Sequence, residues 1–150
     1  MISKHVYLNI YNLHPSNYIL YYFGCGFYHT TLVIGTKEFD YGPGTGIDIT
    51  KLEDSNNLIL REKIYIGFTD KTYEEIYDII DEMSDTYSPF KYDPFKHNCH
   101  NFIIDLSKNI IDNDIEIYTP YYISRFKYFC CCFSCLFPRH NDILQYLRIQ

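Results

Sequence analysis

The chain has 150 residues and a formal net charge of −6 at pH 7, with 19 acidic residues against 13 lysines and arginines. This length suits one domain with a real hydrophobic core and is too short for two. Binding to nucleic acid depends on clustered lysine and arginine that neutralise phosphates, so the acidic balance argues against a nucleic-acid partner.

The N-terminal residues run directly into an alternating strand pattern, without a charged region followed by an apolar stretch. We therefore expect no signal peptide and a cytosolic location. No apolar run reaches the roughly 18 residues that a membrane-spanning helix needs. Four of the six cysteines crowd together near the C-terminus, where they cannot staple distant loops, so we expect free thiols.

The first half of the chain has the alternation of a β-sheet. Segment 5–11 places Val6, Leu8 and Ile10 on one face of a strand. Segment 18–23 is aromatic and lies between turn-forming residues, which leaves a short helix and a strand both open.

A hairpin is predicted next, with a strand at 27–34, a tight turn and a second strand at 37–41. His29 comes at the start of the first of these strands, so it should lie near an end of the sheet, where a cleft can form. The glycine-rich residues 42–46 are predicted to be a turn. They do not resemble a phosphate-binding loop, because no Lys-Ser/Thr pair opens a helix after them.

After a polar segment, residues 60–68 are predicted to form another strand and a helix should start near residue 73. Thr72 and Glu75 have the spacing of a capping box. The apolar stripe of this helix faces away from an acidic side that we interpret as solvated. Pro89 and Pro94 predict an extended approach to the next helix.

Cys99 is predicted to open that next helix. Phe102, Ile103, Leu106 and Ile110 recur with helical spacing after it. A thiol at a helix start lies at the positive end of the helix dipole, near unpaired N–H groups, which favours the nucleophilic thiolate. The alternative is a small buried core residue, because free cysteines are among the most buried residue types.

Cysteine catalysis also needs a base within hydrogen-bonding reach and donors for an oxyanion. His29, at a strand end, is the best candidate base among the six histidines. His97 and His100 lie too close to Cys99 along the backbone to face the thiol easily. The others, His5, His14 and His140, lie in terminal or loop segments.

Four ordered segments resemble a known family: VYLNIYN at 6–12, GFYHT at 26–30, KEFDYG at 37–42, and HNC at 97–99 followed by Asn101 and Phe102. They are similar to the PPPDE family of permuted papain-fold peptidases, and most of all to its desumoylating isopeptidase 2 type. The resemblance runs from about residue 6 to residue 136. It implies an α+β, permuted papain-like cysteine peptidase fold in which helices pack on an antiparallel sheet.

The resemblance implies a catalytic dyad of His29 and Cys99, with no metal or other cofactor. Members act as isopeptidases on SUMO or ubiquitin conjugates, and some act as protein S-acyl thioesterases. Proteins conjugated to ubiquitin or SUMO are therefore the expected partners. The alternative function of a non-catalytic protein-binding module is left open, as is the formation of a homodimer. The family usually has Asn directly after the cysteine, whereas this chain has His100 and then Asn101.

We expect a papain-like domain over 1–125 and a cysteine-rich tail over 126–150. The tail holds Cys130, Cys131, Cys132 and Cys135 among aromatic residues. Cys132 and Cys135 lack the second pair that a zinc site needs. Reversible S-acylation with attachment to a membrane surface is one interpretation of these cysteines, and packing against the domain is the other.

Overall fold

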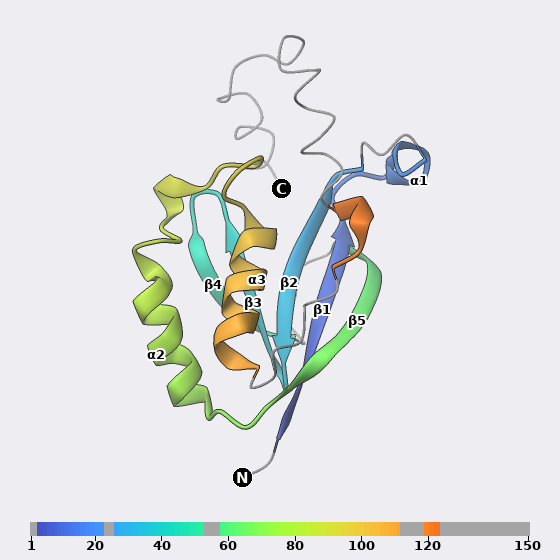
Figure 1. Ribbon diagram of the computed structural model, residues 1–150. Coiled ribbons are helices and arrows are strands. Elements are labelled where there is room, and N and C mark those ends of the chain that lie inside the picture. Colours follow the sequence, from blue (N-terminus) through green and yellow to red (C-terminus); the bar gives the residue numbers. More distant parts are fainter. Residues whose placement is uncertain (1–2, 23–25, 53–57, 112–118, 124–150) are drawn as a thin grey trace.

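The computed structural model describes residues 3–22, 26–52, 58–111 and 119–123 of the protein. The chain is α+β, with helices packed on a five-stranded antiparallel sheet of order β4-β3-β2-β1-β5 (Figure 1). Its elements are β1 (Lys4–Asn12), α1 (Asn17–Leu20), β2 (Tyr28–Ile34), β3 (Lys37–Gly42), β4 (Gly46–Lys51), β5 (Ile59–Thr69), α2 (Tyr73–Ser84), the 3-10 helix η2 (Pro89–Lys91) and α3 (Cys99–Ile110).

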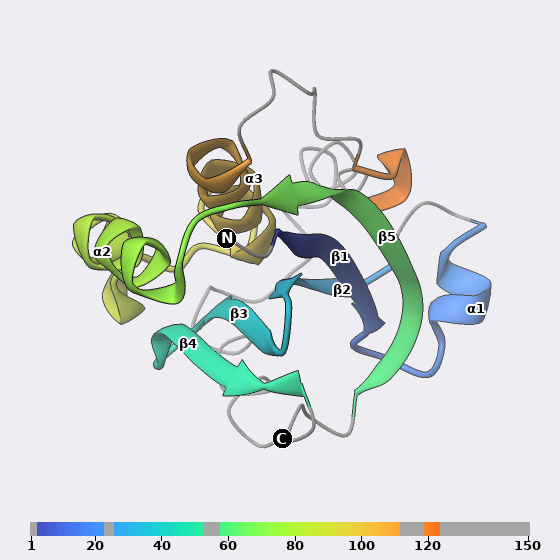
Figure 2. The same cartoon turned by 90° about the horizontal axis from the view of Figure 1, so that it is seen from below.

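The sheet is strongly curved. Seen from below, the strands follow an arc, and β5 bends around one end of it (Figure 2). β1 pairs with β5 along its whole length, with register shifts after Val6 and after Ile10. Such irregularities increase local twist, so they account for the bend of β5.

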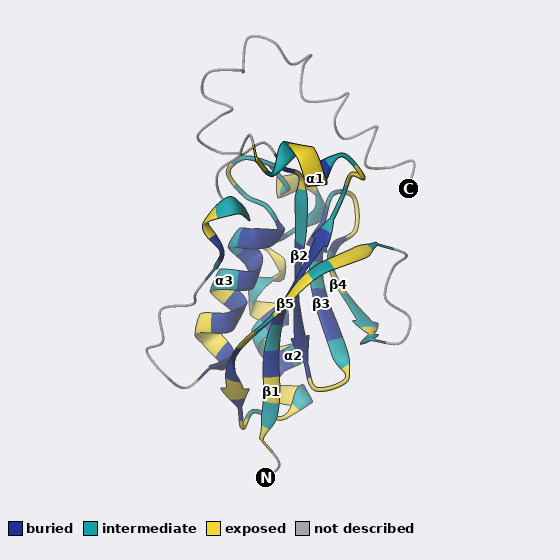
Figure 3. Cartoon of the chain, turned by 90° about the vertical axis from the view of Figure 1, so that its right-hand side faces the viewer, coloured by how far each residue is buried: buried dark blue, intermediate teal, exposed yellow. Residues whose placement is uncertain are grey.

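The core lies between α3 and the sheet. The predicted strand residues Val6, Leu8 and Ile10 are fully buried, as are the predicted helix residues Phe102, Ile103, Leu106 and Ile110. Figure 3 shows the buried side of α3 turned toward the strands. Burying an aliphatic or aromatic side chain of this size contributes about 1.5–3 kcal/mol, so this interface holds α3 firmly against the sheet.

α2 packs beside α3 and β4 at one edge of the molecule (Figure 1). Its predicted capping box is confirmed, because Thr72 Oγ1 accepts from the Glu75 N–H and Glu75 Oε2 accepts from the Thr72 N–H. Ile76 and Ile80 are buried, whereas the acidic residues of the first turn are exposed. The acidic side of this helix is therefore a solvated face, as the sequence indicates.

Two parts of the fold differ from the sequence prediction. β4 was not predicted, although Ile47 and Ile49 alternate with polar residues, because the segment is short and polar overall. The approach to α3 is not extended. It contains η2 and then a tight turn in which Asp93 and His97 pair as an isolated bridge.

The remaining segments agree with the sequence or lie outside the described residues. For segment 18–23 both a short helix and a strand were possible, and the structure has the short helix α1 there. The predicted turn at 42–46 joins β3 to β4. The cysteine-rich tail, 126–150, lies outside the described residues. Among the described residues, no helix has both the length and the apolar composition that a membrane span requires.

Candidate active site

The start of α3 is fixed by a reciprocal cap. Asn98 Oδ1 accepts hydrogen bonds from the backbone N–H groups of His100, at 3.0 Å, and Asn101, at 3.3 Å. Asn101 Oδ1 accepts from the Asn98 N–H at 3.2 Å, and Asn98 Nδ2 donates to the Pro94 carbonyl. Cys99 is thus the first residue of the helix. Asn101, two residues after the cysteine, completes the cap, so the exchanged His100-Asn101 pair leaves the helix start intact.

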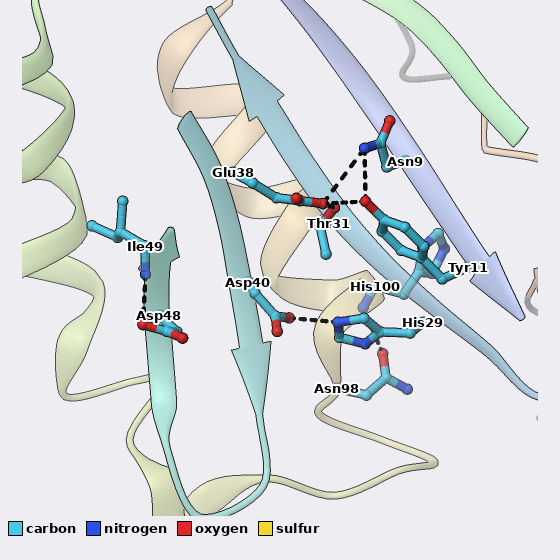
Figure 4. Close-up of polar contacts among 10 residues, drawn as sticks. All are labelled: Asn9, Tyr11, His29, Thr31, Glu38, Asp40, Asp48, Ile49, Asn98 and His100. Atoms are coloured by element: carbon cyan, nitrogen blue, oxygen red, sulfur yellow. Dashed lines mark hydrogen bonds and ion pairs between the residues drawn. The ribbon is translucent and has the colours of Figure 1, made fainter. Parts of the chain in front are cut away.

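β2 brings His29 toward this helix start. β2 and β3 pair from Leu32 to Ile34 only, so His29 lies where the two strands have separated (Figure 4). Its opposite neighbour on β1 is Tyr11, whose ring centroid lies 6.5 Å from that of His29. The predicted position of His29 near an end of the sheet is therefore confirmed.

The imidazole of His29 and the thiol of Cys99 interact electrostatically, and each shifts the pKa of the other. Cys99 is only 5% exposed, and Thr30, the next residue of β2, is fully buried. Burial and the negative charges of Cys99 and Asp40 raise the pKa of Tyr92, which lies just before the tight turn. Residues of β2 and of the loop before α3 thus form the electrostatic environment of the thiol.

Asp40 on β3 lies on the other side of the imidazole. Its Oδ1 is 2.9 Å from His29 Nε2, in an ion pair whose side chains are 13% and 26% exposed (Figure 4). Because Nε2 faces the carboxylate, Nδ1 is the ring nitrogen left for the thiol. Asp40 was not predicted from the sequence as a residue that orients the base. A signal existed, because Glu38 and Asp40 are acidic residues that alternate with buried aromatic residues in a short strand.

The charges of this site support one another. Burial disfavours the charged imidazolium, but Asp40 and Cys99 outweigh it and hold the pKa of His29 well above 6.5. Burial likewise disfavours the thiolate, but the neighbouring His29 outweighs it and lowers the pKa of Cys99 from its ordinary 9.0. Both shifts favour a thiolate–imidazolium pair.

A second buried carboxylate lies behind His29. Glu38 Oε1 accepts hydrogen bonds from the Tyr11 hydroxyl at 2.7 Å and from the Thr31 hydroxyl, and Asn9 Nδ2 lies 3.5 Å away (Figure 4). The network holds Tyr11, whose ring lies against His29. Glu38 therefore supports the imidazole from a distance, whereas Asp40 contacts it directly.

The other described histidines have different contacts. His97 Nε2 lies 2.9 Å from the Thr86 carbonyl and its ring stacks on Tyr87, while His100 is buried in the first turn of α3. His5 contacts aromatic rings of β1 and β5, and His14 accepts from the Ser16 N–H. His140 lies outside the described residues. Within 3–22, 26–52, 58–111 and 119–123, no three His, Cys, Asp or Glu side chains form a metal-binding group.

Residues 4–140 match the family model described as "PPPDE putative peptidase domain", which covers nearly the whole chain. The chain is also 26% identical over 137 residues to a DeSI-like protein of Arabidopsis thaliana. That similarity covers 89% of this chain and 59% of the relative, so the chain spans about three fifths of the relative's length. The family match includes all the elements that carry His29, Asp40 and Cys99. The chain therefore belongs to the PPPDE peptidase family.

Proposed function

We propose that the protein is a thiol hydrolase in which Cys99 is the nucleophile, His29 is the base and acid, and Asp40 orients the imidazole. The observation that carries this proposal is a buried, helix-opening thiol that interacts electrostatically with an imidazole, which is itself ion-paired to a carboxylate. A nucleophile, a base in contact with it and a group that orients the base form the general pattern of covalent acyl transfer.

The reaction starts from the thiolate–imidazolium pair. The Cys99 sulfur attacks the carbonyl carbon, a C–S bond forms, and the carbonyl electron pair moves onto the oxygen. When the carbonyl re-forms, the bond to the leaving amine breaks and His29 Nδ1 gives that amine its proton. Water then attacks the thioester with His29 as base, and the thiolate returns.

The substrate that we propose is an isopeptide bond at the C-terminus of SUMO or another ubiquitin-like modifier. Membership of a peptidase family supports amide hydrolysis, and similarity to a DeSI-like protein supports the modifier. The fold that we propose is the permuted papain-like one. The α+β architecture is consistent with it, as is the chain order, in which the histidine strand precedes the cysteine helix.

The test compares two substrates with one enzyme preparation. A modifier with a fluorogenic amide at its C-terminus reports isopeptidase activity, and an S-acylated peptide reports thioesterase activity. We expect the wild type to hydrolyse the fluorogenic amide of SUMO or of ubiquitin. The Cys99→Ala variant should hydrolyse neither. Turnover of only the S-acyl peptide would replace the isopeptidase proposal by a thioesterase. Turnover of neither, together with retained binding of modifier, would indicate a binding module.

A further inference from the structure

We propose that Tyr11 is a positioning residue for the base of the proposed dyad, and that the buried carboxylate of Glu38 holds Tyr11 in place. In this role the Tyr11 ring fixes the plane of the His29 imidazole. This inference rests on the proposed thiol hydrolase function and extends it to a residue that acts on catalysis through the base.

The ion pair with Asp40 does not by itself fix the imidazole of His29. Asp40 Oδ1 holds one ring atom, Nε2, at 2.9 Å. The torsion that turns a histidine ring about its Cβ–Cγ bond is broad, so a second contact is needed to fix the ring plane. Tyr11 lies directly opposite His29 on β1, and the two ring centroids are 6.5 Å apart with their planes 31° apart. Tyr11 supplies that second contact from a neighbouring strand.

Tyr11 is itself anchored through its hydroxyl. The hydroxyl donates to Glu38 Oε1 at 2.7 Å and accepts from Asn9 Nδ2 at 3.0 Å, and the Thr31 hydroxyl donates to the same Oε1 (Figure 4). These four residues are only 3–6% exposed and come from β1, β2 and β3, the central strands of the sheet. The network therefore fixes the Tyr11 ring relative to the strand that carries His29.

This network is poorly suited to stabilising the core. Within the described residues, Glu38 Oε2 and Asn9 Oδ1 are buried and have no hydrogen-bond partner. An unpaired buried polar group reduces stability, and apolar residues of similar volume often stabilise a core as well as a buried charge does. A role in holding the base accounts for a buried carboxylate at this position.

The test measures the step in which His29 acts as a base. Nitrophenyl acetate acetylates Cys99, the excess ester is removed, and the mass of the Cys99 peptide follows loss of the acetyl group at several pH values. Water adds its oxygen to the acetyl carbon and gives a proton to the imidazole, and the C–S bond breaks to release acetic acid and the thiolate. This step needs no recognition of a modifier.

Three variants and one control separate the ring of Tyr11 from its anchor. Tyr11→Phe keeps the ring and removes the hydroxyl, Glu38→Ala removes the acceptor, and Glu38→Gln keeps a carbonyl acceptor. The matched control is Tyr7→Phe, because Tyr7 is another tyrosine of β1 that lies opposite Val33 and packs on Tyr65 at 5.5 Å. Urea denaturation checks that each variant is folded under the conditions of the rate measurement.

We expect Tyr11→Phe and Glu38→Ala each to slow deacetylation by about 10-fold, less than the roughly 100-fold effect of a 1 Å misplacement. Glu38→Gln should recover part of the loss, and Tyr7→Phe should match the wild type. The rate should rise with pH as the imidazole loses its proton, and the midpoint should stay in place in Tyr11→Phe, because Asp40 still contacts the ring. Lower stability alone would not slow this step in folded protein.

Unchanged deacetylation in Tyr11→Phe overturns the inference. A midpoint that moves in Tyr11→Phe as far as in Asp40→Asn also overturns it, because the role would then be electrostatic. A wild type that loses the acetyl group but hydrolyses no modifier amide would refute only the isopeptidase proposal. A wild type whose Cys99 is not acetylated, or keeps the acetyl group, would refute the thiol hydrolase proposal and this inference with it.

Discussion

α2 and α3 have the same length, twelve residues, and each begins with a capping box, yet their first turns have different environments. The first turn of α2 carries Glu74 and Glu75 in solvent, and hydrogen bonds from Thr72 lower the pKa of Glu75. The first turn of α3 carries Cys99 and His100, both buried. A helix start favours negative charge in both places. On α2 a solvated carboxylate supplies that charge, whereas on α3 a buried thiolate can supply it.

The difference teaches that a cap and a helix dipole do not make a nucleophile. What distinguishes α3 is its position against the separated ends of β2 and β3, which carry His29 and Asp40. The imidazole, not the helix start alone, outweighs the burial of the thiol. The following changes break or sharpen this difference, from the largest expected effect to the smallest.

His29→Ala should have the largest effect, because it removes the base and the largest of the influences that lower the Cys99 pKa. We expect turnover to fall by about 1,000-fold, within the usual range for loss of a general base. Alkylation of Cys99 by iodoacetamide at pH 6 should slow, and its pH profile should shift upward. Mass spectrometry of the modified peptide measures this. Unchanged alkylation would leave the helix start as the sole activator of the thiol.

Asp40→Ala should reduce turnover by about 100-fold, because misplacement of a catalytic group by about 1 Å has an effect of that size. Asp40→Asn should recover part of the loss, since an amide oxygen can still accept from His29 Nε2 without the charge. The matched control is Asp48→Ala, because Asp48 is exposed and lies directly opposite Asp40 on β4. Equal effects of Asp40→Ala and Asp48→Ala would indicate a general effect on the sheet.

The pH dependence of turnover should be bell-shaped. Activity rises as Cys99 loses its proton, and since its pKa is lowered, the acid limb should lie below 9.0. Activity falls as the His29 imidazolium loses its proton, and since its pKa is raised, the alkaline limb should lie above 6.5. In Asp40→Asn the alkaline limb should move down toward 6.5. An unmoved limb in that variant would contradict the assigned role of Asp40.

The two caps give the smallest effect and the most direct comparison of the helices. Thr72→Ala and Asn98→Ala should each reduce the free energy of unfolding by about 1 kcal/mol. Only Asn98→Ala should also slow alkylation of Cys99, because it loosens the helix start that presents the thiol. Urea denaturation and alkylation rates measure the two quantities. Slower alkylation in Thr72→Ala would show that helix stability in general governs the thiol.

Local sequence patterns predicted much of the fold. The alternation at Val6, Leu8 and Ile10 and the helical spacing after Cys99 predicted which faces are buried, because they follow from the periods of strand and helix. The Thr72 and Glu75 pair predicted the start of α2 for the same local reason. β4 was missed, because a short strand of mixed polarity has only a weak pattern of its own.

The sequence by itself determined that Cys99 opens a helix and that His29 begins a strand, since caps and periodicity act between near neighbours along the chain. Only the tertiary structure decided which side chains lie next to Cys99 and His29. Asp40 reaches His29 because β3 stays beside β2 as far as Leu32 and then separates from it, and Cys99 lies near His29 because α3 packs on β2. These contacts depend on strand register and loop closure, which place residues distant in the chain within hydrogen-bonding reach and leave no periodic signal in the sequence.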